Sequence, residues 1–338
     1  MYASRTLTTT TPVSSAREDA VYAKVTWRLI PFLMLCYVVA YLDRVNVGFA
    51  KLQMLTDLKF SETVYGFGAG MFFIGYFFFE VPSNLIMHRV GARVWIARIM
   101  ITWGLVSAGM MFVRSAPVFY AMRFALGAAE AGFFPGIIYC LTKWFPRRER
   151  ARAIAGFMTA VVVAGVIGGP ISGALLSLDG VAGFAGWQWL FVVEGLPAVV
   201  LGVTVLRLLP EQPSDARWLS HAEQQALLAR LTQDESEGSA TQTIAGALVN
   251  ARVWLLGIVY FTIPVALYAM GFWLPQIVRE TSGGGAVVVG WLSAIPYAVA
   301  AVGMVVIGRN SDRTGERRWH IALSALVGGA SFALAGVV

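Results

Sequence analysis

Charged residues inside the first long apolar segment are the sequence's clearest indication of chemistry. Tyr41, Asp43 and Arg44 lie within a stretch long enough to span a membrane. A charge at bilayer depth costs from about 2.5 to more than 10 kcal/mol, so such residues normally face a partner or a water-filled cavity. Helical periodicity places Tyr41 and Arg44 on one face and turns Asp43 about 100° away. This predicts a site where Arg44 binds an anion and Asp43 handles a proton or cation. The alternative is an ion pair that only fixes helix packing.

A second charged pair occurs in the fourth apolar segment. Arg123, Gly127 and Glu130 share one helix face by their i, i+4, i+7 spacing. With a cytoplasmic N-terminus, Arg44 and Arg123 both fall in the outer half of the membrane, and Glu130 lies roughly 10 Å deeper. Two arginines above one carboxylate predict an anion clamp over a proton relay. The alternatives are that Arg123 extends to the outer interface and that Glu130 forms a static pair with Arg123.

Further polar and aromatic residues could complete this site. Tyr76 in the second segment is a candidate hydrogen-bonding wall residue, and Tyr268, Trp273 and Gln276 in the seventh are candidate substrate contacts. The seventh segment contains prolines such as Pro275, and helices interrupted at membrane depth often line transporter cavities. Trp273 could instead be an interfacial aromatic near a helix end.

Composition places these residues in an all-α membrane protein. Hydrophobic residues make up 57% of the 338 residues and charged residues 13%, whereas soluble chains are nearer half apolar and a quarter charged. A spanning helix needs about 20 mostly apolar residues. Nine such segments are expected, at 26–48, 64–87, 93–113, 117–141, 152–178, 187–208, 252–278, 286–307 and 319–338.

The same pattern predicts the domain organisation. Residues 1–25 are predicted to be a disordered cytoplasmic tail, and 26–208 a six-helix bundle. Residues 209–251 form a polar cytoplasmic linker, with a capping-box pattern beginning at Ser220. Residues 252–338 form three further helices, an incomplete second bundle.

The distribution of basic residues sets the orientation. Most of the 26 lysines and arginines fall on the cytoplasmic side if the N-terminus is inside. This bias, with anionic lipid headgroups as partners, explains the net charge of +7 without nucleic acid. Only two cysteines occur, and we find no metal-ligand cluster, nucleophile elbow or phosphate loop. We therefore expect no metal, no cofactor and no enzyme activity.

Two glycine patterns concern helix packing and internal repetition. Gly165, Gly169 and Pro170 belong to a small-residue face in the fifth segment, which predicts close helix packing and a possible hinge. In addition, the residues Arg89, Gly91 and Arg93 recur in register later in the chain, as Arg313, Gly315 and Arg317. Such a weak repeat is typical of transporters built from duplicated bundles. Glu194, in the sixth segment, is interpreted as structural.

These motifs resemble a known family. The Gly308…Asp312-Arg313-Thr314-Gly315-Glu316-Arg317 loop and the Gly165…Gly169-Pro170…Gly173 element resemble signatures of the major facilitator superfamily. Four further motifs are similar to its anion:cation symporter branch, which includes bacterial tartrate, phthalate, hexuronate and galactonate permeases. These are Tyr41-Leu42-Asp43-Arg44-Val45-Asn46, Glu80-Val81-Pro82-Ser83-Asn84, Arg123…Glu130-Ala131-Gly132-Phe133-Phe134-Pro135-Gly136 and Phe272-Trp273-Leu274-Pro275.

The resemblance implies two six-helix bundles, a midline cavity and alternating access. It also implies residue roles: proton coupling by Asp43 and Glu130, substrate binding by Arg44 and Arg123, and a lining of Tyr41 and Tyr76. The chain departs from the family at His88, where an aspartate is usual, and in having nine expected spans where the family has twelve, as if truncated after the ninth.

The sequence therefore predicts a monomeric, multi-pass transporter of the cytoplasmic membrane, with its N-terminus inside, that takes up a small organic anion with protons. A proton is favoured over sodium because no oxygen cage is evident. One alternative is an anion facilitator or exchanger without cation coupling. Another is an anion-binding membrane protein that does not transport.

Overall fold

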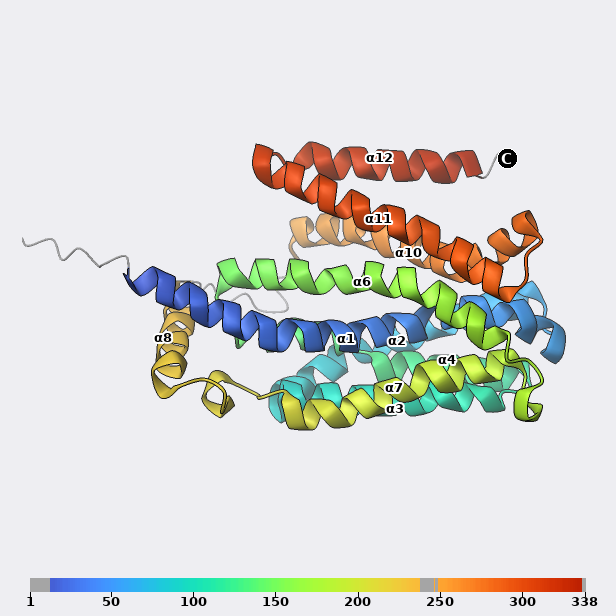
Figure 1. Ribbon diagram of the computed structural model, residues 1–338, viewed down its shortest axis with the longest axis horizontal. Coiled ribbons are helices and arrows are strands. Elements are labelled where there is room, and N and C mark those ends of the chain that lie inside the picture. Colours follow the sequence, from blue (N-terminus) through green and yellow to red (C-terminus); the bar gives the residue numbers. More distant parts are fainter. Residues whose placement is uncertain (1–12, 238–245, 247–248, 336–338) are drawn as a thin grey trace, which may run out of the picture.

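The protein is a bundle of long helices. The computed structural model describes residues 13–237, 246 and 249–335, and within these ranges the regular structure is entirely helical. Among the described residues, eight segments are long and apolar enough to cross a membrane, and they lie side by side along the long axis of the molecule (Figure 1). Their helices are α1 (Val13–Leu58), α2 (Glu62–Val90), α3 (Ala92–Gly109), α4 (Ala116–Glu130) with α5 (Phe133–Thr142), α6 (Arg147–Leu176), α7 (Gly186–Leu208), α10 (Ala251–Ser282) and α11 (Ala286–Thr314).

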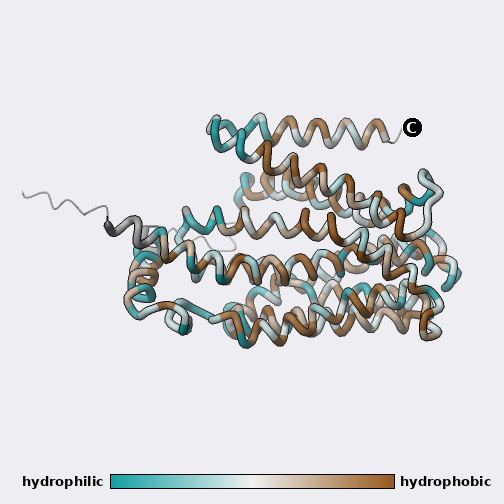
Figure 2. Tube along the Cα trace, viewed as in Figure 1, coloured by the Kyte–Doolittle hydropathy of each residue, from teal (hydrophilic) through white to brown (hydrophobic). Residues whose placement is uncertain are grey.

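The membrane-spanning character predicted from composition is confirmed for eight of the nine segments. The ninth coincides with α12 (Arg318–Ala335), which is not among the eight candidate spans of the described residues. Because the predicted segment 319–338 extends beyond the described residues, the ninth span stays a prediction. Figure 2 shows hydrophobic residues along the long helices and hydrophilic residues at their ends and around α8 (His221–Glu237).

The first six spans pack against one another, and the later helices lie on one side of them. Within the bundle, α3 packs on α7, α2 on α4, and α1 on both α6 and α7. Of the later helices, α10 packs against α1 and α11 packs against α6. The last helix, α12, lies beyond α11 at the edge of the molecule (Figure 1). The charged residues of α1 and α4 are therefore held inside a packed set of helices.

The interface between α6 and α11 is built from small residues. A Cβ on Gly173 would meet the carbonyl oxygen of Ala286 at 2.5 Å and the Cα of Gly290 at 3.1 Å. Gly169 faces Gly290 in the same way, and the ring of Tyr297 lies against Gly165. The close approach expected from this glycine face is therefore present, with α11 as its partner. A hinge at Pro170 stays a prediction.

The prediction of a disordered tail does not hold for residues 13–25. This stretch is the first part of α1, and the side chains of Val21 and Val25 are buried. Lys24 donates to both carboxylate oxygens of Glu223 on α8, at 3.1 and 3.0 Å. Buried apolar side chains and this ion pair hold the stretch against α8. Residues 1–12 lie outside the described residues.

The first part of the polar linker is docked on the six-span bundle. Ser220 and Glu223 form the predicted capping box at the start of α8, with hydrogen bonds of 2.7 and 3.3 Å. The ring of Trp218 stacks on that of Trp144 at 5.8 Å between centroids, and Leu227 is buried in the core of the bundle. This segment therefore belongs structurally to the six-span unit.

The repeated Arg-x-Gly-x-Arg pattern has the same backbone role in both copies. Gly91 ends α2 with φ 97°, and Gly315 ends α11 with φ 66°. Glycine adopts positive φ without the steric penalty of a Cβ, so it is suited to end a helix. The structure corrects one detail, because Gly308 and the exposed Asp312 and Arg313 lie within α11 and the turn begins only at Gly315.

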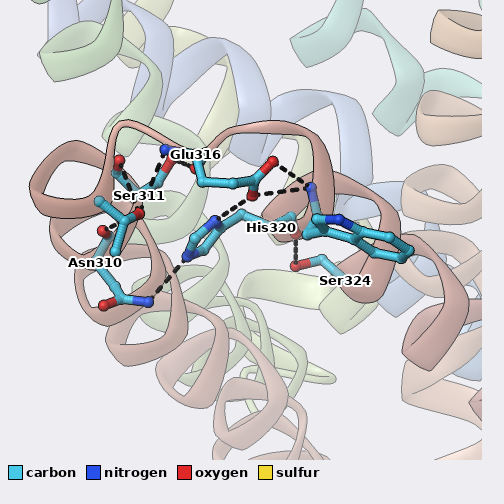
Figure 3. A network of polar contacts seen from close by, with 7 residues as sticks. Asn310, Ser311, Glu316, His320 and Ser324 are labelled. Atoms are coloured by element: carbon cyan, nitrogen blue, oxygen red, sulfur yellow. Dashed lines mark hydrogen bonds and ion pairs between the residues drawn. The ribbon is translucent and has the colours of Figure 1, made fainter.

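The later copy is stabilised by a local polar network that joins α11 to α12 (Figure 3). His320 receives contacts on both ring nitrogens, from Glu316 at 3.1 Å and Asn310 at 2.9 Å. Ser311 donates to the carbonyl oxygen of Glu316 at 2.8 Å, and the backbone N–H of Trp319 donates to the Glu316 carboxylate at 3.0 Å. This network positions the start of α12, while any gating role of the motif stays a prediction.

In the earlier copy, a carboxylate from the linker caps the following helix. Glu211 accepts hydrogen bonds from the backbone N–H groups of Ala92 at 3.0 Å and Arg93 at 2.9 Å, and from Lys143 Nζ at 2.5 Å. Burial alone would raise the pKa of Glu211, but the bonds from Lys143, Arg93 and Ala92 outweigh it and lower the pKa below its ordinary value. Glu211 therefore stabilises the fold as the carboxylate.

This arrangement predicts how stability depends on pH. A carboxylate with a lowered pKa in the folded state contributes stability above its unfolded pKa and loses it as the pH falls through the folded pKa. For Glu211→Gln we expect a loss of about 1 kcal/mol at pH 7, because the group is partly exposed to solvent. Thermal unfolding in detergent between pH 7 and pH 3 should show a smaller acid-induced decrease in Tm for this variant than for the wild-type protein. The exposed Asp215→Asn is the control, and an equal acid-induced decrease for Glu211→Gln would contradict the assignment.

Candidate functional site

A break in the fourth span positions the first site residue. The segment expected at 117–141 is two helices, and Glu130 is the last residue of α4. Gly132 has φ 87° at the break, where a Cβ would meet the Cβ of Ser83 at 2.9 Å. Ser83 donates to the carbonyl oxygen of Ala131 at 2.7 Å, which satisfies an acceptor freed by the break. Glu130 thus lies at the negative end of a helix dipole, where a carboxylate needs a positive partner.

That partner is Arg44 on α1. The side chains of Arg44 and Glu130 are both buried, and they form an ion pair between Arg44 Nη2 and Glu130 Oε1. Arg44 Nη1 donates to the hydroxyl of Tyr268 on α10, so one guanidinium joins the first bundle to the later helices. The guanidinium also lies 5.5 Å from the ring centroid of Tyr76. Arg44 therefore has partners on α2, α4 and α10.

Arg123 presents the opposite situation. Its side chain is fully buried at 0% exposure, and none of its three guanidinium nitrogens has a hydrogen-bond partner. The guanidinium lies 5.0 Å from the ring centroid of Phe72, while Tyr65, Asp43 and Glu130 are close enough to interact with its charge. A buried charge without hydrogen bonds is costly. Arg123 is thus a positive group whose donors are free for an anion.

The geometry contradicts two of the alternative interpretations of Arg123 and Glu130. The burial of Arg123 contradicts the alternative in which it extends to the outer interface. The structure also pairs Glu130 with Arg44, where the other alternative expected a static pair with Arg123. Both guanidinium groups lie over the ring of Phe72, at 5.7 Å for Arg44 and 5.0 Å for Arg123. Phe72 is thus a shared contact of the two arginines, which the sequence pattern did not indicate.

Asp43 is directed away from Arg44, as helical periodicity predicts. It accepts hydrogen bonds from Ser107 Oγ on α3 and from Asn46 Nδ2, the latter at 3.1 Å. The side chain is buried, so Asp43 belongs to a second polar cluster behind the arginine site. Tyr41 is also buried, and its hydroxyl has no hydrogen-bond partner.

A third cluster closes the predicted outer end of the bundle. Lys51 on α1 is buried and pairs with Glu62 on α2 at 2.5 Å. Lys51 also donates to Gln276 on α10 and lies 4.7 Å from the ring centroid of Tyr65 and 5.6 Å from that of Trp273. The predicted contacts Trp273 and Gln276 therefore lie in this closure, while Tyr268 lies at the arginine site. A role for Trp273 and Gln276 in substrate binding stays a prediction.

The opposite ends of the later helices are apart from the bundle. The first half of α10, residues 251–263, and the second half of α11 are largely exposed, whereas Phe272, Leu274 and Val289 near the other end are buried. Tyr65 donates to the carbonyl oxygen of Phe272 at 3.2 Å, and Arg279 donates to that of Leu52 at 2.9 Å. The described helices thus adopt a conformation closed at the predicted outer end.

Close approach of α1 and α10 in this closure depends on a glycine. A Cβ on Gly48 would meet the carbonyl oxygen of Gly271 at 2.5 Å and the Cα of Phe272 at 3.2 Å. We expect Gly48→Leu to prevent outer closure and to reduce transport by about tenfold or more, because overpacking costs about 1–3 kcal/mol. Gly257→Leu is the matched control, since nothing lies within 4 Å of a Cβ there. Spin labels at the exposed positions Lys59 and Ser282 would report a longer distance in Gly48→Leu, and an unchanged distance would contradict this role.

Sequence reasoning missed several residues of these clusters. Phe72 and Tyr65 look like ordinary apolar positions of a spanning helix. Lys51 lies outside the predicted first span, 26–48, although a single lysine just after an apolar stretch is a signal for a buried or interfacial charge. The break after Glu130 had a signal in Gly132, which is followed closely by a proline.

Together, the helical bundle and its buried charges define a polytopic membrane protein of the transporter type. The family model of the Major Facilitator Superfamily matches residues 33–338. The chain therefore belongs to the major facilitator superfamily, a family of membrane transporters and not of enzymes.

Curated relatives share a large part of this chain. The "Putative metabolite transport protein NicT" of Pseudomonas putida is 52% identical over 316 residues, which are 93% of this chain and 72% of the relative. A "Putative tartrate transporter" of Agrobacterium vitis is 50% identical, covering 96% of this chain and 72% of the relative. The "Inner membrane transport protein RhmT" of Escherichia coli is 43% identical, covering 96% of this chain and 76% of the relative.

Solved structures show the same fold. A bacterial homologue of the human lysosomal transporter Spinster, in an inward-facing and occupied conformation, matches with a TM-score of 0.65 at 19% identity. The match covers 84% of this chain and 61% of the homologue. The xylose transporter XylE of Escherichia coli, partially occluded and inward open, matches with a TM-score of 0.62 at 14% identity, covering 85% of this chain and 73% of XylE. At these identities the likeness concerns the fold alone.

Proposed function

We propose that the protein is a secondary active transporter that carries a small organic anion by proton symport and alternating access. The observation that carries this proposal is Arg123, whose guanidinium is fully buried and without a hydrogen-bond partner. A carboxylate matches the planar fork of a guanidinium and would supply both the missing acceptors and the opposite charge. The tartrate transporter names of two relatives support a carboxylate or sugar acid as the substrate class.

The ion pair between Arg44 and Glu130 suggests how a proton could be coupled to the anion. When Glu130 takes up a proton, its negative charge is lost and the pair with Arg44 weakens. Arg44 then has donors free for a second group of the substrate, while Tyr76 and Tyr268 lie beside it. Release of the proton restores the pair and displaces the anion. In this mechanism Arg123 receives the carboxylate and Glu130 controls Arg44.

The observed conformation fits one half of an alternating-access cycle. The closure around Lys51 seals the predicted outer end, and the other ends of α10 and α11 are apart from the bundle. We propose that this is the inward-facing state of a monomer in the cytoplasmic membrane, with the N-terminus inside. Opening of the Lys51 closure would give the outward-facing state.

Counterflow in proteoliposomes tests the substrate class. Vesicles holding the chain would be loaded with one unlabelled anion from a panel of tartrate, galactonate, glucuronate and phthalate, and uptake of the same labelled anion would be measured. We expect exchange of one or a few of these anions, and none in Arg123→Ala. Exchange that persists in Arg123→Ala would contradict the site. Exchange without any response to a proton gradient would indicate a facilitator, and binding without exchange an anion-binding protein.

A further inference from the structure

A second polar cluster inside the bundle is not used by the arginine site. It joins Asp43 and Asn46 on α1 to Ser107 on α3, Ser172 on α6 and Glu194 on α7, and each of these side chains is at most 5% exposed. Two carboxyl groups are thus buried together where four spans meet. Glu194 looked structural in the sequence because its partners are on other helices.

The hydrogen bonds of this cluster leave acceptors without donors. Ser172 Oγ donates to Glu194 Oε1 at 2.7 Å, and Asn46 Nδ2 donates to Asp43 Oδ1 at 3.1 Å. Glu194 Oε2 and Asn46 Oδ1 have no partner although both are buried. Asn46 and Asp43 both lie within interaction range of the Glu194 carboxyl group. One more donor is therefore missing between these groups.

The charges of the cluster also do not balance. Within the part of the chain that the structure describes, neither Asp43 nor Glu194 forms an ion pair with a lysine or arginine. The groups facing them are hydroxyls on α3 and α6 and the amide of Asn46, while Glu130 and Arg123 on α4 act on Asp43 through their opposite charges. Two buried carboxylates that interact with each other and have no ion-pair partner are unfavourable, and a proton on one of them would relieve this repulsion.

We propose that Asp43, Asn46 and Glu194 form one proton-binding unit, in which Glu194 carries a proton that is exchanged with Asp43 and takes part in symport. A proton on Glu194 Oε2 turns an unpaired acceptor into a donor and removes one of the two negative charges. Asn46 bonds to Asp43 and lies beside Glu194, so it connects the two carboxyl groups. The proton is gained by one carboxyl group as it leaves the other or the solvent, and no other group changes.

This unit deepens the proposed function and rests on it for the step of coupling. Asp43 interacts electrostatically with Arg123. An anion bound by Arg123 therefore reduces the positive potential at Asp43. Protonation of the unit and occupation of the anion site then favour each other. Glu130 also interacts electrostatically with Asp43 and with Arg123, so Glu130 and the unit are two coupled proton sites.

Infrared spectroscopy tests the protonation without relying on transport. A protonated buried carboxyl group has a C=O stretching band that is absent from a carboxylate. For the full chain in lipid bilayers at neutral pH, we expect such a band to be lost in Glu194→Gln and shifted in Asp43→Asn. Asp215→Asn, which removes an exposed carboxylate outside the membrane, should leave the band unchanged. An identical band in Glu194→Gln would overturn the assignment of the proton.

Transport in the same preparations tests the coupling. We expect Glu194→Gln to keep anion counterflow but to lose accumulation driven by a proton gradient by about tenfold, a change that equals 1.4 kcal/mol. Ser172→Ala removes only the donor to Glu194, so it should reduce proton-driven accumulation by a smaller factor than Glu194→Gln does. Unchanged proton-driven accumulation in Glu194→Gln would show a structural proton and overturn the proposal, as would accumulation that follows a sodium gradient. A parent without counterflow would refute the proposed function, while the infrared result would still decide where the proton resides.

Discussion

Replacing Arg123 with methionine is expected to abolish anion binding and at the same time to raise the thermal stability of the protein. Truncating one partner of a buried charge pair costs about 2–5 kcal/mol of binding, which corresponds to a loss of affinity of about 30-fold or more. The opposite effect on stability follows because the free protein buries this guanidinium without hydrogen bonds. Replacing a buried charge with an apolar side chain of similar volume can stabilise a fold by about 1–4 kcal/mol. Tryptophan fluorescence titration with the anion found by counterflow, and thermal unfolding without it, measure the two effects.

Arg44→Met is the matched control for this prediction. It also removes a buried guanidinium, but it leaves Glu130 as a buried carboxylate without its ion-pair partner. We therefore expect Arg44→Met to lower Tm, whereas Arg123→Met raises it. If both variants lower Tm equally, Arg123 is paired in the free protein and is not a vacant anion receptor.

Replacing Glu130 with glutamine is expected to uncouple the anion from the proton. The amide cannot carry the negative charge that holds Arg44, so Arg44 is released at any pH. Counterflow of the anion should persist, whereas accumulation driven by a proton gradient should fall to the level reached without a gradient. Breaking a buried pair by removing one partner costs about 3–5 kcal/mol, so this variant should also unfold at a lower temperature.

Uptake at several external pH values separates Glu130 from a merely structural residue. In the parent, accumulation should depend on external pH, and in Glu130→Gln that dependence should disappear. Asp215→Asn is the control, because Asp215 is an exposed carboxylate outside the candidate membrane spans. Loss of counterflow and accumulation together in Glu130→Gln, in a folded protein, would assign Glu130 to anion binding instead of coupling.

The sequence predicted best those structural features that depend on a single helix. The direction of Asp43 and the small-residue face of α6 both follow from periodicity along a single segment, and the structure agrees with each. The end of α2 at Gly91 is also a local feature, because a helix terminus depends on local backbone chemistry.

Side-chain contacts between different helices could not be predicted from the periodicity of single segments. The pair between Arg44 and Glu130 joins residues far apart in the chain, whereas single-helix spacing indicated a static pair of Glu130 with Arg123 only as an alternative. Trp273 and Gln276 looked like cavity residues, but the approach of α10 to α1 places them beside Lys51. Side-chain partners in a bundle depend on how helices are rotated and crossed, which packing sets and one sequence does not display.

Simultaneous measurement of anion uptake and internal pH in proteoliposomes tests the central claim most directly. A labelled anion and a pH-sensitive dye inside the same vesicles would follow both fluxes after an inward proton gradient is imposed. We predict that uptake of one organic anion against its gradient is accompanied by acidification of the lumen, and that both are lost in Arg123→Met. Anion accumulation without acidification, or acidification without any anion, would contradict proton-coupled symport.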